Sequence, residues 1–342
     1  MSFTNYFGGK MFRKNFLLSV IFSLSLFSQL ANAELPTLTV YSYNSFMSQW
    51  GPGEVIKKGF EAQCNCQLDV VTLGDGVSVL NRIRLEGDKT NADVILGLDN
   101  NLLEQAKQAN LLIPHQIAKP DNLNTNWWDD SFMPYDFGYF AFIYNIDKVK
   151  NPPHSLHELV DNKAGWKIIY QDPRTSTPGL GLLFWMKKVY GNNAANAWQQ
   201  VAKNTVTVTK GWSEAYGMFL KGEADLVLSY NTSPVAHIMN ENDRHYQAAI
   251  FDEGHYRQVE VAGIIKYSQE VDLARQFLRY LLTPEVQRQF AEKNVMYPII
   301  KTDIPNAFAQ INSVNRSLEF KPEEIEKHQK AWIREWQSAI SK

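Results

Sequence analysis

The sequence has little of what marks nucleic-acid-binding, membrane-spanning or metal-dependent proteins. Its formal net charge is −2, whereas a nucleic-acid surface carries a basic stripe. After residue 33, no apolar run approaches the roughly 20 residues of a membrane span. The seven histidines are scattered, and His154 and His157 alone do not form the ligand set of a metal centre. We expect neither a metal nor a cofactor.

Common catalytic signatures are missing as well. The chain contains no phosphate-binding GxxxxGK[ST] string, no HExxH and no GxSxG. Cysteine is scarce, with Cys64 and Cys66 spaced C-x-C. Two ligands do not make a tetrahedral zinc centre, and two lone thiols in an oxidising compartment tend to pair, although so small a ring gains little loop entropy. We expect a local disulfide, with a catalytic thiol as the alternative.

The N-terminus holds the one sustained apolar run. A basic segment at 10–14 precedes an uncharged stretch at 16–30, and Ala31-Asn32-Ala33 supplies a small-x-small cleavage signature. No cysteine follows the apolar run, which disfavours a lipoprotein anchor. The sequence therefore predicts a signal peptide over residues 1–33, a periplasmic location, and no stable membrane insertion after cleavage.

The remaining chain of about 309 residues alternates strand-like and helix-like segments, the pattern of an α/β protein. Two βαβ units in the first half imply a parallel sheet with right-handed crossovers. The predicted strands are 38–41, 68–73, 92–96, 137–144, 168–170, 206–208, 226–229 and 258–265. The predicted helices include 55–60, a helix from Val77, 100–109 with Asp99 as its N-cap, 180–190, 273–282 and 323–340.

Two long β runs, 137–144 and 258–265, are better suited to crossing between lobes than to surface loops. The fold class is therefore α/β with two lobes, each a mostly parallel sheet flanked by helices, and the ligand in the cleft between them. Residues 34–140 and 264–342 are predicted to form lobe 1, which is discontinuous. Residues 141–263 are predicted to form lobe 2.

Open α/β sheets bind ligands beyond the carboxyl ends of their strands, where helix N-termini converge. In the loop 172–179, Thr177 is predicted as N-cap and Pro178 as the first helical residue. The loop 230–234 repeats this pattern, with Ser233 before a proline. Both loops suit a hydroxyl or phosphate group on a ligand, or are ordinary helix caps.

Two further loops carry other chemistry. Trp212 is expected just outside a helix capped by Ser213, where an indole suits a stacking surface for a ring or cation, or covers the helix end. Asp75 follows a strand, and Gly76 allows a ligand to approach the backbone closely; capping alone also explains Asp75. Together the loops fit a small, partly aromatic, cationic ligand with a polar tail.

Long strings of this sequence resemble the periplasmic thiamine-binding proteins of bacterial ABC importers. They include TVYSYNSFMSQWGPG, GDGVSVLNRIRLEG, YDFGYFAFIYN, IIYQDPRTSTPGLGLLFWMKKVYG and TVTKGWSEAYGMFLKGEADLVLSYNTSP, and the likeness covers nearly the whole mature chain. The resemblance implies a type II periplasmic-binding-protein fold. It also implies that thiamine and its mono- and diphosphate are ligands, and that the partners are a membrane permease and its ATPase subunit.

The resemblance also implies a set of ligand-binding residues. They are Tyr43, Asp75, Gly76, Ser176, Thr177, Trp212, Tyr230, Asn231, Thr232 and Ser233. Two positions differ from the family pattern: Val295 stands where an aromatic wall residue is usual, and Ala236 where a tyrosine occurs.

Rival functions of other classes make different demands. Bacterial thiaminases resemble this fold and use a cleft cysteine, but Cys64 and Cys66 lie at the start of a strand, the wrong end for a cleft, and a nucleophile needs a nearby base. A polyamine receptor needs several carboxylates along its channel, whereas the loops offer one clear carboxylate, Asp75. A ferric-ion receptor needs clustered tyrosines, and no adjacent tyrosine pair occurs. We therefore expect no catalytic residues and a receptor rather than an enzyme.

Overall fold

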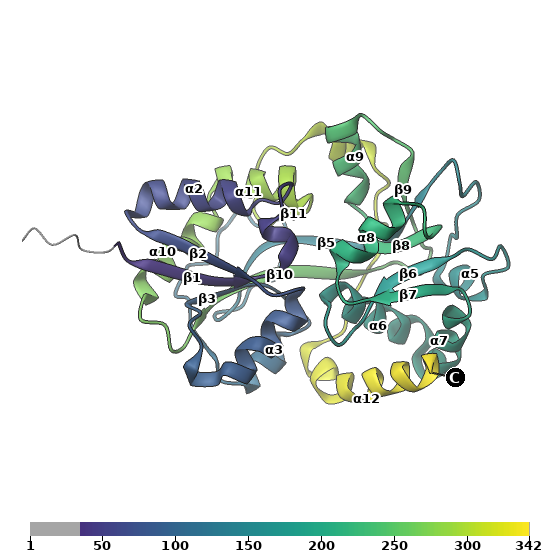
Figure 1. Cartoon of the computed structure of the whole chain (residues 1–342), viewed down its shortest axis with the longest axis horizontal. Coiled ribbons are helices and arrows are strands. Elements are labelled where there is room, and N and C mark those ends of the chain that lie inside the picture. Colours follow the sequence, from purple (N-terminus) through teal and green to yellow (C-terminus); the bar gives the residue numbers. More distant parts are fainter. Residues whose placement is uncertain (1–34, 342) are drawn as a thin grey trace, which may run out of the picture. The chain divides into compact units, whose positions relative to one another are not determined.

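The computed structural model describes residues 35–341 (Figure 1), so the predicted signal peptide at 1–33 lies outside the described residues. Within the described part of the chain, no helix combines the length and the apolar character needed to cross a bilayer. The predicted α/β alternation is confirmed, and the strands form a mixed sheet in the order β2-β1-β3-β10-β5-β8-β6-β7.

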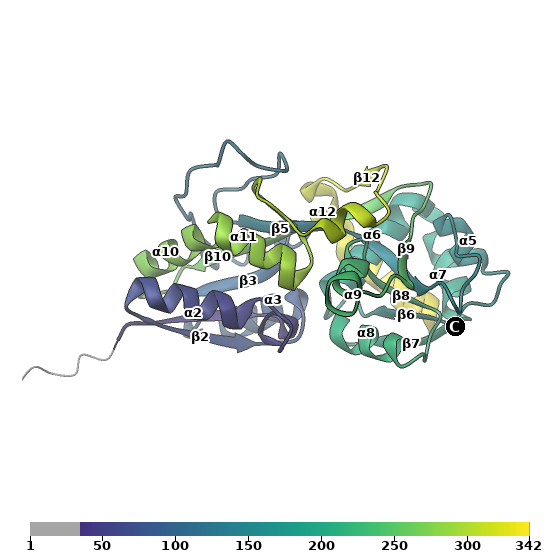
Figure 2. The same ribbon diagram turned by 90° about the horizontal axis from the view of Figure 1, so that it is seen from above.

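The first part of the sheet is parallel, as predicted. It consists of β1 (Thr37–Ser42), β2 (Gln67–Thr72) and β3 (Val94–Asp99), connected through α2 (Gly53–Cys64) and α3 (Gly76–Glu86). Every residue of β3 is buried, and such a continuous apolar run is typical of a parallel strand covered on both faces. Figure 2 shows α10 (Val271–Leu281) and α11 (Pro284–Gln289) beside α2.

Two long antiparallel strands join the two parts of the sheet, β5 (Met133–Asn145) and β10 (His255–Ile265). The first half of β5 pairs with β10, and its second half pairs with β8 (Leu226–Tyr230) and β9 (Tyr246–Ala249). β10 pairs on its other side with β3. The prediction of two crossing strands is thereby confirmed.

The second part of the sheet is again built on parallel pairs. Here β6 (Ile168–Gln171) lies between β7 (Thr205–Thr209) and β8. Its helices are α5 (Leu156–Asp161), α6 (Thr177–Tyr190), α7 (Ala194–Ala202), α8 (Trp212–Leu220) and α9 (Ser233–Glu241). Short elements complete the fold: α4 (Leu103–Gln108), β4 (Leu112–Ile113), a π-helical turn η4 (Phe290–Asn294), β11 (Tyr297–Pro298) and β12 (Ser317–Leu318).

The last helix, α12 (Pro322–Ile340), packs against α6 and α7, as Figure 1 shows. The Trp336 indole donates a hydrogen bond to the Tyr170 hydroxyl at 3.2 Å, and Lys187 forms an ion pair with Glu335 at 3.2 Å. This helix therefore contacts elements predicted for lobe 2, and it also packs against α4 (Leu103–Gln108), which is predicted for lobe 1. The division at residues 140 and 263 stays a prediction.

Several helix starts differ from those predicted. α6 has Ser176 at its N-cap and Thr177 as its first residue, one position earlier than expected. α8 begins at Trp212 itself, with Gly211 at the N-cap, so Ser213 does not cap it. The Ser176 side chain accepts no hydrogen bond from its own helix, and Gly211 has no side chain that could do so. A prediction based on local capping therefore missed these starts, because the Ser176 hydroxyl bonds Asp75 instead and α8 begins directly after a glycine.

The helix predicted over 100–109 is also shorter than expected. It begins at Leu103, because the Asp99 carboxylate accepts hydrogen bonds from the backbone N–H of Asn101 at 3.0 Å and from its amide at 3.2 Å. That local turn uses the carboxylate oxygens, so Asp99 is not a helix N-cap. The carboxylate is fully buried, and burial raises the pKa of Asp99 to about 7.

Candidate ligand-binding site

A cavity of about 630 Å³ lies where several strand ends and helix starts meet. Its walls come from the segment after β1, the N-termini of α3, α6 and α8, the β8–α9 turn, β10 and η4. Most of the predicted ligand-binding residues line it: Tyr43, Asp75, Gly76, Thr177, Trp212, Tyr230, Thr232 and Ser233. Segments far apart in the sequence therefore converge on one cavity, as predicted for the carboxyl ends of an open sheet.

Asp75 connects three of these segments. It occupies the N-cap of α3 but makes no side-chain cap bond there. Its Oδ2 instead accepts hydrogen bonds from Ser176 Oγ at 2.6 Å and from the Trp212 backbone N–H at 3.0 Å. The side chain is nearly buried, and burial raises the pKa of Asp75 to about 6 against the lowering effect of these two donors. Ser176 is fully buried and does not line the cavity, so it acts on the site through Asp75.

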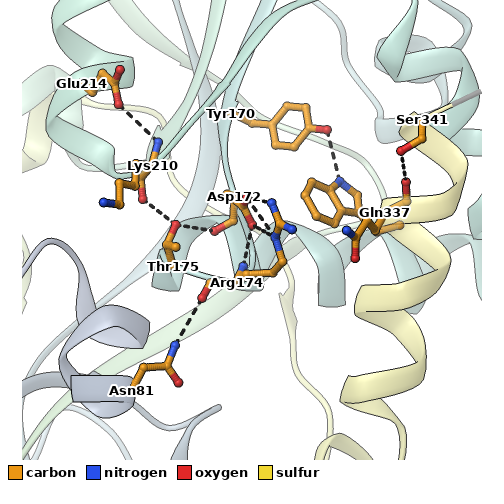
Figure 3. Close-up of polar contacts among 10 residues, drawn as sticks. Asn81, Tyr170, Asp172, Arg174, Thr175, Lys210, Glu214, Gln337 and Ser341 are labelled. Atoms are coloured by element: carbon orange, nitrogen blue, oxygen red, sulfur yellow. Dashed lines mark hydrogen bonds and ion pairs between the residues drawn. The ribbon is translucent and has the colours of Figure 1, made fainter. Parts of the chain in front are cut away.

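The loop at residues 172–176, which carries Ser176, forms polar contacts within itself, with the segment before α8 and with α3 (Figure 3). The Arg174 guanidinium pairs with the Asp172 carboxylate, with Nε 2.9 Å from Oδ1. Thr175 Oγ1 donates to the Lys210 carbonyl at 2.7 Å, which ties the loop to the segment before α8. From α3, the Asn81 amide reaches the Arg174 carbonyl at 3.4 Å. These contacts fix the position of the α6 N-terminus at the cavity.

Two glycines permit close backbone approach at the same wall. A Cβ on Gly76 would collide with the Gly97 carbonyl oxygen, so only glycine lets the start of α3 lie against β3. Gly97 itself has φ +96°, a left-handed conformation that glycine adopts readily. A Cβ there would strike the Tyr43 ring. Gly97 thus allows the Tyr43 ring to lie directly on β3 at the edge of the cavity.

An aromatic wall stands on the α8 side. The Trp212 indole stacks on Tyr216, with ring centroids 5.0 Å apart and planes 21° apart. Its Nε1 donates to Ser229 Oγ at 2.7 Å, which fixes the ring orientation. Trp50, from the segment before α2, approaches the same indole edge-on at 5.6 Å. This wall offers the flat, oriented surface that binds rings and organic cations.

The β8–α9 turn contributes two kinds of residue. The hydroxyl of Ser233 accepts a hydrogen bond from the Tyr230 backbone N–H at 3.2 Å and lies 2.7 Å from Ser229 Oγ. Asn231 does not line the cavity. Its Oδ1 accepts the Tyr139 backbone N–H at 3.1 Å, and its amide donates to the Tyr297 hydroxyl at 3.0 Å. The Asn231 side chain therefore braces β5 against β11 rather than pointing at a ligand.

The crossing strands carry a polar group that was not among the predicted site residues. Glu260 of β10 lines the cavity, and Asp136 of β5 is its partner in the strand register. The Asn294 amide donates to Asp136 Oδ2 at 2.7 Å and to Glu260 Oε2 at 3.1 Å. Burial raises the pKa of Asp136 to about 7 and that of Glu260 well above its usual range. The available signal was an acidic residue inside each of two otherwise apolar strand runs.

Both positions that differ from the family pattern lie at the cavity. Ala236 lines it from α9, and Val295 lines it just after η4. Val295 has φ +56°, which is an outlier for a β-branched residue. The two small side chains leave space where the resemblance leads one to expect rings.

The two cysteines form the expected disulfide, which joins the end of α2 to the start of β2. Neither cysteine lines the cavity, and a disulfide carries no thiolate nucleophile. Among residues 35–341, no group of three or more His, Cys, Asp or Glu side chains is arranged to hold a metal ion. The residues that line the cavity offer hydrogen bonding, stacking and charge pairing to a ligand.

A two-part α/β sheet, with a cavity lined from both parts and beside the crossing strands, is the architecture that solute-binding proteins use. A family model for bacterial extracellular solute-binding proteins matches residues 89–321. The chain belongs to this family, and it is a periplasmic member.

Its relatives narrow the class. The thiamine-binding periplasmic protein of Escherichia coli K12 is 54% identical over 308 residues, covering 90% of this chain and 94% of that protein. The protein of the same name from Brucella suis is 45% identical over 309 residues, covering 90% and 92%. A solved structure of a periplasmic thiamin binding protein has a TM-score of 0.88 at 54% identity and covers 90% of this chain and 97% of that one.

Proposed function

We propose that this protein is the periplasmic receptor that captures thiamine and delivers it to an ABC importer. The cavity carries this proposal, because it unites a stacking wall at Trp212, a carboxylate at Asp75 and hydroxyl groups at Thr177 and Ser233. The identity of 54% to a thiamine-binding periplasmic protein over nearly the whole chain supports the same ligand.

Each part of thiamine has a counterpart in the cavity. Trp212 and Tyr230 would face the two rings, the second of which is a fixed cation. Asp75 would accept a hydrogen bond from the aminopyrimidine or balance the cation through its free Oδ1. Thr177, together with Thr232 and Ser233, would bind the hydroxyethyl arm at two helix N-termini, where backbone N–H groups also favour a phosphate. The mono- and diphosphates are therefore ligands too.

The proposal includes two partners and excludes catalysis. A membrane permease and its ATPase subunit would receive the loaded protein. No enzyme activity is assigned, because the Cys64–Cys66 disulfide removes the only thiols and lies outside the cavity lining. Thiamine recovered intact after long incubation with the protein would agree with this; a cleaved pyrimidine would contradict it.

The test is a calorimetric titration of the mature protein, stripped of ligand by unfolding and refolding. Thiamine, its two phosphates and spermidine are titrated in turn. We expect one thiamine per chain with submicromolar affinity, about −8 kcal/mol or better, and no binding of spermidine. Absence of heat with every thiamine compound would mean that the space at Val295 and Ala236 has changed the ligand.

A further inference from the structure

Three carboxylates lie in register across the middle of the sheet. Glu260 of β10 is opposite Asp99 of β3 on one side and opposite Asp136 of β5 on the other. All three are more than nine-tenths buried. Like charges directly opposite each other on neighbouring strands repel, and burial strengthens the repulsion because the local dielectric is low. The sequence maintains this arrangement only with compensation from other groups.

Hydrogen bonds account for part of this compensation. Asp99 is satisfied locally by Asn101. The amide of Asn294 donates to both Asp136 and Glu260, and the amide of Gln258 also donates to Glu260 at 3.3 Å. The other oxygen of Asp136, Oδ1, is buried and has no hydrogen-bond partner. Neutral amides are therefore the hydrogen-bond donors to this pair of acids, and one acceptor, Asp136 Oδ1, has no partner.

A positive charge would complete the group, and none is supplied within the described residues. Among residues 35–341, no lysine, arginine or histidine forms an ion pair with Asp136 or Glu260. Buried charges in proteins are normally paired. The unmet charge opens onto the cavity, because Glu260 is one of its lining residues.

Aromatic side chains border this carboxylate on the cavity side. The Tyr43 hydroxyl donates to Asn294 Oδ1 at 3.2 Å, and the Tyr230 hydroxyl donates to Gln258 Oε1 at 3.0 Å. The side-chain amide of Gln258 in turn donates a hydrogen bond to Glu260 Oε1 at 3.3 Å. Both tyrosines line the cavity. A buried carboxylate beside aromatic rings is the arrangement that binds a flat organic cation.

We propose that Glu260 is the carboxylate that pairs with the cationic ring of the ligand, and that Asp136 is a positioning residue behind it. A single proton held between the two acids leaves the pair with one negative charge, which matches a ligand with one ring cation. This inference rests on the proposed function, since thiamine carries such a ring. It assigns the cation to the crossing strands and leaves Asp75 to the aminopyrimidine.

The pairing makes binding dependent on pH. Burial raises the pKa of Glu260 well above its usual range and that of Asp136 to about 7. In acid both carboxyls hold protons and the pair is neutral, so affinity for a cation falls as pH falls below about 7. The other titratable or charged groups around the pair are Asp99, Tyr43, Tyr135 and Tyr230, with Asp75, Glu292 and Lys293 at the cavity wall.

The test compares a cation with its neutral analogue. The mature protein and its Glu260→Gln variant are titrated calorimetrically with thiamine and with deazathiamine, whose thiophene replaces the charged ring. We expect Glu260→Gln to weaken thiamine binding by at least about tenfold and to change deazathiamine binding by no more than about twofold. Glu253→Gln, at a half-buried carboxylate outside the cavity lining, is the matched control and changes neither affinity.

A second variant separates the charge role from a structural one. Asp136→Asn leaves Glu260 as the only titrating carboxyl of the pair, so the pH at which thiamine affinity is lost in acid differs from that of the unaltered protein. Equal weakening of both compounds by Glu260→Gln, or an unchanged ratio of their affinities, would overturn the inference. If the unaltered protein binds neither compound, the proposed function itself fails and the inference fails with it.

Discussion

Ser176 Oγ donates a 2.6 Å hydrogen bond to Asp75 Oδ2, although the two residues lie 101 positions apart. The bond joins the N-terminus of α6 to the N-terminus of α3. Together with the bond from the Trp212 backbone N–H to the same oxygen, it connects the two parts of the sheet at the cavity. These two hydrogen bonds hold the N-termini of α3, α6 and α8 together beside the ligand-binding site.

Replacement of Ser176 by alanine should therefore weaken thiamine binding. A hydrogen bond to a charged group contributes about 1.5–3 kcal/mol, so we expect roughly a tenfold to hundredfold loss of affinity by calorimetry. Ser78→Ala is the control, because Ser78 Oγ donates to the neutral Thr175 carbonyl at 2.9 Å. The Ser78→Ala variant should lose about 1 kcal/mol of thiamine-binding free energy. An equal loss in both variants would show that the charge on Asp75 does not matter.

Trp212→Ala should weaken thiamine binding at least tenfold, about 1.4 kcal/mol. The substitution removes the ring that stacks on Tyr216 and lines the cavity. Trp212→Phe keeps an aromatic face but loses the hydrogen bond to Ser229, so its loss should be smaller. Affinity that does not change in Trp212→Ala, measured by calorimetry, would remove the indole from the ligand contacts.

The order of the elements and most of the cavity follow from the sequence, because apolar periodicity and strand-to-helix loops are local signals. The N-cap of α6 was misplaced by one residue and that of α8 by two. The error at α6 has a physical reason. Capping rules assume that an N-cap side chain bonds its own helix, whereas the Ser176 hydroxyl bonds Asp75. Glu260 was missed because its partner, Asp136, depends on the strand register, which no local pattern specifies.

The buried acids should make the ligand-free protein less stable as pH rises. The pKa of Asp99 is raised to about 7 by burial, so the folded state keeps a proton that the unfolded chain releases near pH 4. The contribution of Asp99 to the free energy of unfolding therefore falls as pH rises from about 4 to about 7 and changes little above that.

Asp99→Asn tests this dependence. The variant keeps an oxygen that can accept the Asn101 backbone N–H but has no charge to bury, so we expect it to be about 1–3 kcal/mol more stable at pH 8. The gain should vanish near pH 3, about one unit below the pKa of an unfolded aspartate, where the carboxyl of the parent protein is neutral in both states. Urea unfolding at the two pH values measures the difference. A stability gain that is the same at both would contradict the assignment.

Removal of the disulfide should affect stability slightly and binding not at all. The Cys64–Cys66 bridge closes a very short loop, which corresponds to about 1–2 kcal/mol in the chain-entropy model. The double variant Cys64→Ser, Cys66→Ser should therefore melt a few degrees lower, by about 2–4 °C, and bind thiamine with unchanged affinity. A large loss of affinity in the double variant would place the end of α2 in the binding site. Cleavage of thiamine by the parent protein, but not by the double variant, would support the alternative of a catalytic cysteine.

The edge-on pair of Trp50 and Trp212 has a further consequence. The two indoles, 5.6 Å apart, come from opposite walls of the cavity, one from the segment before α2 and the other from α8. Trp50 is about half exposed. Any movement that separates the walls also separates the rings and admits water between them. The protein thus contains an intrinsic fluorescent reporter, and its emission spectrum can follow opening and closing in real time without an attached dye.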